Sequence, residues 1–324
     1  MNEIRIEESL PKNKLSVLGY PELLKGANVI SYGYVTDDNL ILPFVYKKSS
    51  RFWKRIELPC NIIGESVGDD KQVFINKAIN LLCKQYNVDV INTLNTNPMN
   101  VYPEGAYYCK FGSYILDLSQ SEDELFAGLH SKHRNVIRKA EKDGLCVESG
   151  PQYWEDCYLL IKGTYERQGK YFGSKSSYSD LLKLKDNVDF WIVKSQDSIQ
   201  GCAILFWDSY SSYYMHGGSA EHTHSGAMNY LHWKAILKMK ERGVRYYDFV
   251  GARLNPDEGS KLEGIQRFKS RFGGPMHVGY MWRYTNHPLK MRLYNIIYKL
   301  YFKWIKGDHT IKDIITEERE KGNF

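Results

Sequence analysis

The sequence lacks the cysteine spacings, leader segment and long apolar run that mark several large classes of protein. Its six cysteines are scattered, with no C-x-x-C pair and no Cys/His spacing typical of zinc, so we expect neither a metal site nor a disulfide framework. Residues 1–14 contain acids and no apolar core, unlike a secretory signal peptide. No apolar run reaches the roughly 18 residues that a membrane-spanning helix needs. These absences predict a protein of the reducing cytoplasm.

Common catalytic motifs are missing as well. The chain has no G-x-G-x-x-G after its first strand, no G-K-S or G-K-T of a P-loop and no H-E-x-x-H. Dinucleotide-binding dehydrogenases, P-loop NTPases and zinc peptidases therefore fit poorly.

What is present is a folded chain with a small positive charge. Its 324 residues are 43% apolar and 25% charged, which is enough for two domains and too apolar for a disordered chain. Lys and Arg number 44 against 38 Asp and Glu, a net charge of +6. This excess favours polyanionic ligands without the charge density of a nucleic-acid coat protein.

The first part of the chain alternates strands and helix. Two β-branched, aromatic runs at 28–35 and 40–47 flank a polar turn, which predicts a hairpin. An amphipathic helix at 73–86 follows, capped by Asp69 or Asp70. Strands are expected at 88–94 and 107–118. We therefore predict a first domain over residues 1–118.

A second domain begins with a capping box at Ser121, where Glu124 is the third residue of the helix. A helix over 132–143 ends at Gly144, which can adopt the left-handed conformation. The expected elements after it are a hairpin at 190–195 and 199–208, a strand at 211–219, a helix at 227–243 and a strand at 244–251. This order, with a mixed sheet, is typical of the acetyltransferase-like (GNAT) fold. We predict an α/β protein with two tandem GNAT-like domains, at 1–118 and 119–286, and a C-terminal amphipathic helix and tail over 287–324.

Several polar residues have spacings that suit anions. Arg134 and Arg138 share one face of the basic helix and could clamp a phosphate, or could simply be solvated. Arg167 and Tyr171 are also four apart, beside glycines, where they could bind a diphosphate or carboxylate or only pack at the surface.

Strand 211–219 contains a further candidate pair. Alternation places Tyr214 and His216 on one face, and Gly217 and Gly218 permit a bulge or a close approach of the backbone to a ligand. His216 could be a base or an ordinary hydrogen-bonded histidine.

The most specific segment is K-L-E-G-I-Q-R-F-K-S-R-F-G-G-P at 261–275, after Y-D-F-V-G-A at 247–252. These motifs, and the helix R-N-V-I-R-K-A-E-K-D-G at 134–144, resemble the Fem family of peptidoglycan-bridge aminoacyltransferases, within the GNAT-like acyltransferase group. The resemblance covers about 121–284 well and the first domain only by architecture. The ordinary acetyl-CoA pyrophosphate signature is absent.

The resemblance implies transfer of an aminoacyl group from aminoacyl-tRNA to an amine, without a covalent enzyme intermediate. The Phe-Lys pair of the family maps onto Phe268 and Lys269, and the lysine is implied to stabilise an oxyanion or the terminal phosphate of tRNA. Arg167 and Tyr171 map less securely onto the groups that bind the precursor diphosphate. The family's strand with Tyr-x-Tyr-Gly maps onto Tyr214 and His216. Because one tyrosine is replaced by His216, the identity of the acceptor substrate stays open. Asp248, in an apolar strand, is interpreted as a structural acceptor, with a base role as the alternative.

Residues 288–306 are apolar and aromatic with five Lys or Arg and no acid. A helix of this kind lies on the anionic inner leaflet of a membrane or docks on its own protein.

Three functions remain in competition. The first is a Fem-like N-acyltransferase that uses aminoacyl-tRNA and a peptidoglycan or cell-envelope precursor. The second is an acyl-CoA-dependent N-acetyltransferase that acts on an amino sugar in surface-polysaccharide synthesis. The third is a non-catalytic RNA- or glycan-binding module. No permanently bound cofactor is expected, and the location is predicted to be cytoplasmic, at the inner membrane face if the C-terminal helix binds lipid.

Overall fold

The computed structural model describes residues 3–26, 28–50, 53–66, 69–94, 96–169, 172–196, 198–294, 296–297 and 313–324. The chain forms two compact units. The first unit comprises 1–112, 251–257 and 278–324, and the second comprises 113–250 and 258–277. This grouping differs from the three continuous segments expected, because β6 (Tyr107–Asp117) and β12 (Met276–Thr285) each have residues in both units.

The first unit is built on a mixed sheet with the order β1-β2-β3-β4-β5-β12-β6. Its other strands are β1 (Arg5–Glu7), β2 (Val29–Thr36), β3 (Ile41–Ser50), β4 (Trp53–Leu58) and β5 (Val90–Thr93). The predicted hairpin is confirmed: β2 and β3 pair antiparallel, from Thr36 opposite Ile41 onward.

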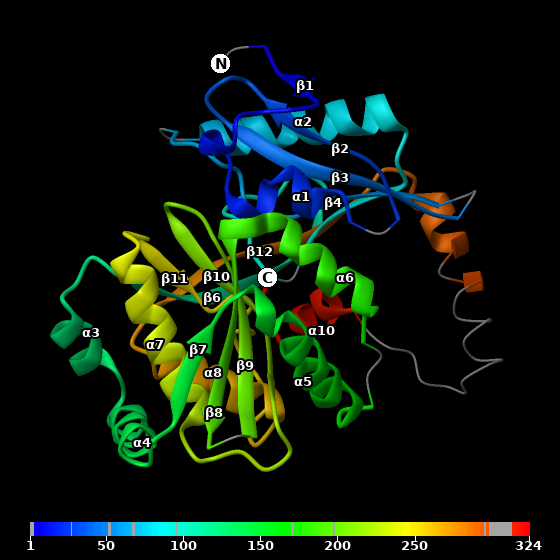
Figure 1. Cartoon of the computed structure of the whole chain (residues 1–324). Coiled ribbons are helices and arrows are strands. Elements are labelled where there is room, and N and C mark those ends of the chain that lie inside the picture. The colour runs from blue at the N-terminus through cyan, green and yellow to red at the C-terminus, as the bar shows by residue number, and fades with distance from the viewer. Residues whose placement is uncertain are drawn as a thin grey trace. The chain divides into compact units, whose positions relative to one another are not determined.

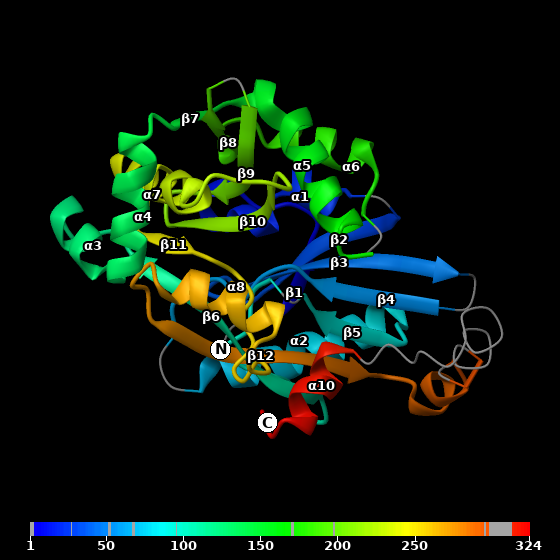
Figure 2. The same cartoon turned by 90° about the horizontal axis from the view of Figure 1, so that it is seen from below.

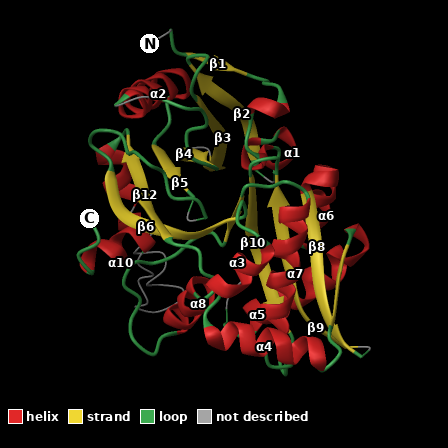
Figure 3. Cartoon of the chain, turned by 90° about the vertical axis from the view of Figure 1, so that its left-hand side faces the viewer, coloured by secondary structure: helices red, strands yellow, loops and turns green. Residues whose placement is uncertain are grey.

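Helix α2 (Asp70–Tyr86) connects β4 to β5, which pair in parallel. Parallel neighbours need such a crossover, so the helix follows from the topology. Its apolar side packs on the sheet through a set of five buried residues: Phe74, Ile75, Ala78, Ile79 and Leu82 (Figure 3). The predicted side-chain cap is wrong, because Asp69 occupies the N-cap without a capping hydrogen bond. A short helix α1 (Pro21–Leu24) precedes β2.

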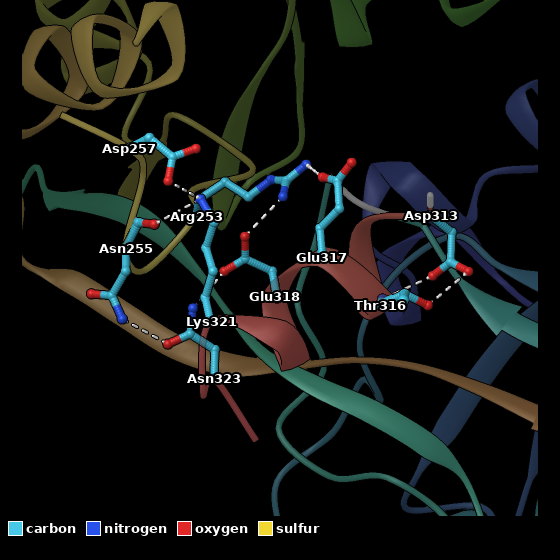
Figure 4. A network of polar contacts seen from close by, with 9 residues as sticks. All are labelled: Arg253, Asn255, Asp257, Asp313, Thr316, Glu317, Glu318, Lys321 and Asn323. Atoms are coloured by element: carbon cyan, nitrogen blue, oxygen red, sulfur yellow. Dashed lines mark hydrogen bonds and ion pairs between the residues drawn. The ribbon is translucent and has the colours of Figure 1, made fainter. Parts of the chain in front are cut away.

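The C-terminal residues are tied to the loop 251–257 by a polar network (Figure 4). In helix α10 (Ile314–Glu320), Glu318 is fully buried and accepts hydrogen bonds from Arg253 and Asn323, at 2.8 and 2.7 Å. Glu317 binds the other guanidinium nitrogen of Arg253 at 2.8 Å. Residues 288–294 are also helical. The remainder of the predicted C-terminal helix, 298–306, lies outside the described residues.

The second unit repeats the plan, with the strand order β6-β11-β10-β9-β8-β7. Its strands are β7 (Cys146–Ser149), β8 (Val188–Ser195), β9 (Ser198–Trp207), β10 (Ser211–Ser219) and β11 (Tyr246–Asp248). Its helices are α3 (Glu122–Gly128), α4 (Ser131–Lys142), α5 (Trp154–Glu166), α6 (Lys175–Ser179), α7 (Ala227–Glu241) and α8 (Lys261–Ser270). Again one parallel pair, β10 and β11, is joined through a helix, here α7. The predicted tandem architecture with mixed sheets is confirmed.

Helices cover both faces of the second unit's sheet. Figure 2 shows α4 and α7 on one side of β8–β10 and α5 with α6 on the other. The core under α7 includes Ala203 and Leu205 of β9, together with Ile236. The predicted capping box is present, since Ser121 and Glu124 bind each other's backbone N–H. Gly144, with φ +76°, ends α4 as expected.

Candidate functional site

Four groups of the second unit meet where β11 ends. The ammonium group of Lys269, in the last turn of α8, donates to the carbonyl oxygen of Val250. Asp248 Oδ1 accepts from the Ser113 hydroxyl and from the Val250 N–H, the latter at 2.7 Å. The exposed fractions of Lys269, Asp248 and Ser113 are 8%, 5% and 1%. Lys269 is therefore a buried cation and not a surface lysine.

The turn that holds the lysine has a left-handed backbone. Val250 has φ +42°, a region that a β-branched residue rarely adopts because its Cβ crowds the backbone. The Asp248 carboxylate binds the N–H of this residue and Lys269 binds its carbonyl, so two charged side chains stabilise the strained turn. Backbone strain of this kind is often found at functional sites.

Burial shifts the pKa values of both charged groups toward neutrality. Burial lowers the pKa of Lys269 to about 8, opposed by the nearby charge of Asp248. Burial raises the pKa of Asp248 to about 6, opposed by hydrogen bonds from Ser113 and Val250 and by the charge of Lys269. Desolvation outweighs attraction in each case. The pKa values of both groups therefore lie closer to neutral pH than those of exposed groups of the same type.

Aromatic and imidazole rings pack beside the lysine. The Phe268 ring lies 5.6 Å from the rings of His133 and His232 and 5.2 Å from that of Phe272. His232 is fully buried; its Nδ1 pairs with the Tyr247 hydroxyl at 2.8 Å, and its Nε2 has no partner among the described residues. Burial and then the charges of Lys269 and His133 lower the pKa of His232 to about 3. Burial also lowers the pKa of His133 to about 4, so both histidines are neutral near pH 7 and these rings beside Lys269 carry no charge.

The predicted pairing of Tyr214 and His216 on one face is wrong. A β-bulge at Met215 shifts the register, so that Tyr214 lies opposite Leu205 and His216 opposite Ile204. Since Leu205 and Ile204 are consecutive on β9, the two side chains point to opposite faces. The Tyr214 ring packs on His232 at 4.3 Å, whereas His216 faces the Tyr178 hydroxyl at 3.4 Å. Of the two residues, only Tyr214 packs among the aromatic and imidazole rings beside Lys269.

Arg167 caps the end of α5 and borders a separate cavity. Its Nη2 donates to the carbonyl of Ser219 at 2.5 Å and to Thr164 Oγ1 at 3.1 Å. The cavity of about 400 Å³ is lined by Asp156, Leu159, Leu160, Gly163, Arg167 and Ile199. Tyr171, its predicted partner, lies outside the described residues.

The two arginines of the basic helix already have partners. Arg134 donates to the carbonyls of Ala127 and Leu129 at the end of α3. Arg138 lies over the Phe126 ring, 5.0 Å from its centroid. Both guanidinium groups are turned toward α3, so part of the capacity predicted for phosphate is used within the protein.

Some residues of the cluster were not predicted. Ser113 and the Val250 turn have no sequence signature, because a serine in a strand and a valine after it are ordinary. A histidine between Leu231 and Trp233 in an apolar helix was a usable signal for His232, since such a position is buried.

Among the helices that the structure describes, none combines the length and the apolar composition needed to span a bilayer. In the described part of the chain, no group of three or more His, Cys, Asp or Glu side chains could hold a metal ion.

Comparison with known proteins finds a family that matches part of the chain and several structures with a similar fold. Residues 129–270, which include β10, α7, β11 and α8, match the acetyltransferase (GNAT) domain family. FemX is similar in structure, with a TM-score of 0.65 and 15% identity over 88% of this chain and 94% of that one. L-PGS from Bacillus licheniformis has a TM-score of 0.51, with 14% identity over 86% and 97% of the two chains.

A third similar structure is the C-terminal domain of a protein assigned as a lysylphosphatidylglycerol synthetase, from Agrobacterium fabrum. Its TM-score is 0.50, with 12% identity over 81% of this chain and 86% of that one. No curated protein matches the chain in sequence. Residues 129–270 thus resemble an acetyltransferase (GNAT) domain, which supports an acyltransferase, and the chain shares its fold with FemX.

Proposed function

We propose that this chain is a Fem-like N-acyltransferase that moves an aminoacyl group from aminoacyl-tRNA to an amine of a peptidoglycan or cell-envelope precursor. The observation that carries the proposal is the buried Lys269 ammonium, held on the strained Val250 turn beside Asp248, inside the acetyltransferase domain. The similarity to FemX supports it, as does the lysyl group in the name of the Agrobacterium relative.

The chemistry needs a localised positive charge more than a nucleophile. The acceptor amine attacks the ester carbonyl, a C–N bond forms, and the carbonyl oxygen gains negative charge. When the C–O bond breaks, the 3′ oxygen of the tRNA leaves and takes up a proton, and the amine loses one. In our proposal Lys269 stabilises the oxyanion, which a preorganised charge does most effectively where water is excluded. Phe268 shapes the acyl site. Arg167, Arg134 and Arg138 attract phosphate through their positive charge, although part of their bonding capacity is used within the protein.

An acyl-CoA donor is the second candidate, because the matching family is described as acetyltransferase. The test gives the full chain either tRNA charged with radiolabelled alanine, serine or glycine, or labelled acetyl-CoA, with the same mixture of amine acceptors. Label transferred from tRNA supports the main proposal, and label transferred only from acetyl-CoA replaces it. If the chain transfers label from neither donor and binds RNA in a salt-sensitive way, the result supports the non-catalytic module.

We also propose a cytoplasmic location with peripheral contact at the inner membrane face. The basic, acid-free composition of residues 288–306 supports this contact. Fractionation of cells into soluble and membrane pools tests it, and recovery only in the soluble pool at low salt would contradict it.

A further inference from the structure

The first unit has a surface cavity beside an exposed apolar helical face. The cavity is about 460 Å³ in volume and is lined by Lys54, Asn87, Asp89, Asn286, His287, Pro288, Leu289 and Lys290. The last three lining residues open the helical segment 288–294, drawn in orange in Figure 1.

One side of this segment is anchored to the sheet. Lys290 Nζ forms an ion pair with Asp89 at 2.7 Å, and Asp89 is 2% exposed. The Tyr294 ring stacks on Trp53 of β4, with ring centroids 4.2 Å apart and planes inclined by 16°. The orientation of the segment is therefore fixed by a buried carboxylate and an aromatic stack.

The outer side presents large aliphatic residues to solvent. Leu289, Leu293, Ile296 and Ile297 are 79%, 58%, 55% and 57% exposed. Counted from Leu289, the other three residues follow at four, seven and eight positions, and in a helix this spacing places all four on one arc of roughly 100°. Leu289 also lines the cavity, so the apolar arc and the cavity adjoin.

Positive charge surrounds this arc and enters the cavity. Lys290 lies at one edge of the arc, and the exposed Arg292 lies at the other. Lys54 lines the cavity, and the described residues show no ion pair for its ammonium group. The cavity's carboxylate, Asp89, is already engaged by Lys290 and by the Lys54 backbone N–H at 2.8 Å. The amide of Asn87 and the ring of His287, 3.1 Å apart, add polar groups.

We infer that this surface docks on an anionic membrane, with a phospholipid phosphate in the cavity at Lys54 and acyl chains against the arc of Leu289, Leu293, Ile296 and Ile297. The inference rests on the proposed peripheral location. An apolar arc flanked by cations, with no acid in 288–297, complements a layer that is negative at its surface and apolar beneath. A binding site for a protein partner would more often be surrounded by a rim of mixed polar residues.

The test measures binding of the full chain to sedimenting vesicles of phosphatidylcholine alone and of phosphatidylcholine with phosphatidylglycerol. We expect preference for the anionic vesicles, about fivefold weaker binding for Lys54→Ala and about tenfold weaker binding for Leu293→Ser. The matched controls are Lys84→Ala, an exposed lysine on α2, and Ile30→Ser, at a site 56% exposed on β2. Both should bind like the unaltered chain.

Each failure has its own meaning. If the unaltered chain binds neither vesicle, the proposed location and this surface are both wrong. If it prefers anionic vesicles but Lys54→Ala and Leu293→Ser bind equally well, the surface alone is wrong. If Leu293→Ser instead abolishes a dimer in sedimentation velocity, the arc is an interface between two copies, which also overturns the inference. Acyl transfer to a water-soluble acceptor should be unchanged in both variants.

Discussion

At the scale of single residues, the proposed reaction depends most on the charge of Lys269. Replacing Lys269 by Ala removes the cation from a site that excludes water, so we expect turnover to fall by about 10²-fold or more. Lys269→Arg keeps the charge and should retain more activity than Lys269→Ala. The measurement is kcat with a saturating donor, and Lys261→Ala, an exposed lysine of the same helix, serves as the control. Equal turnover in the Ala variant and the unaltered chain would remove Lys269 from the mechanism.

The pH dependence of turnover gives a second prediction for this lysine. A pKa lowered to about 8 means that the ammonium form is present below pH 8 and is lost above it. Because the oxyanion needs the charged form, kcat should decline as the pH rises through about 8, and Lys269→Arg should shift that decline upward. Protonation of Asp248, whose pKa is raised to about 6, should limit activity on the acid side. A flat profile from pH 7 to 9 would contradict the proposed role.

At the scale of elements, the C-terminal helix α10 is held by one buried ion pair and one partly exposed pair on the same arginine. Glu318 is fully buried, whereas the Glu317 side chain is 39% exposed. Glu318→Gln removes the buried partner of Arg253 and leaves only the partly exposed Glu317 to balance its charge, so it should lower the free energy of unfolding by about 3 kcal/mol. Glu317→Gln should lower it by less than about 1 kcal/mol, because solvent screens the exposed pair. Urea unfolding compares the two, and equal losses would show that the network does not depend on burial.

The contact of β10 with α5 leaves no space for a side chain at Gly218. A Cβ atom there would lie 2.7 Å from backbone atoms of Leu160 and Ile161. Gly218→Ala must push the helix from the sheet and should lower the free energy of unfolding by about 1–3 kcal/mol. Gly264, inside α8, has open space around its missing Cβ. Gly264→Ala should therefore raise stability by about 0.5–1 kcal/mol. Thermal unfolding should show changes in stability of opposite sign for the two variants, which separates the effect of steric crowding from that of helix propensity.

At the scale of the whole molecule, periodicity and turn residues were sufficient to predict the repeated architecture. The hairpin at 28–47, the crossover helices and the capping box depend on local patterns, and each is present. The bulge at Met215 was not predictable in position, because the glycines that permit it follow the residue where the register shifts. The shared strands β6 and β12 depend on long-range pairing that leaves no local signature. The burial of Lys269 also escaped sequence reasoning, since a lysine at a helix end is usually solvated.

The stability of the whole molecule in acid depends in part on the neutral buried histidines of the second unit. Burial and then the charges of Arg271 and His130 lower the pKa of His133 to about 4, and His232 is lower still. An unfolded histidine titrates near 6.5, so between pH 6.5 and 4 the unfolded chain binds more protons than the folded one. Stability should therefore fall as the pH drops through this window, by about 3 kcal/mol for His133 alone at pH 4.

Replacing His133 tests this account, because its ring packs against Phe272 at 4.8 Å and its Nδ1 is buried without a partner among the described residues. His133→Leu removes the titrating group and the unpaired nitrogen while keeping an apolar contact, so the urea midpoint should change less between pH 6.5 and 4.5 than in the unaltered chain. His222→Asn, at an exposed loop position, should leave the original dependence intact. An unchanged slope in His133→Leu would mean that carboxylates elsewhere, and not this imidazole cluster, control acid unfolding.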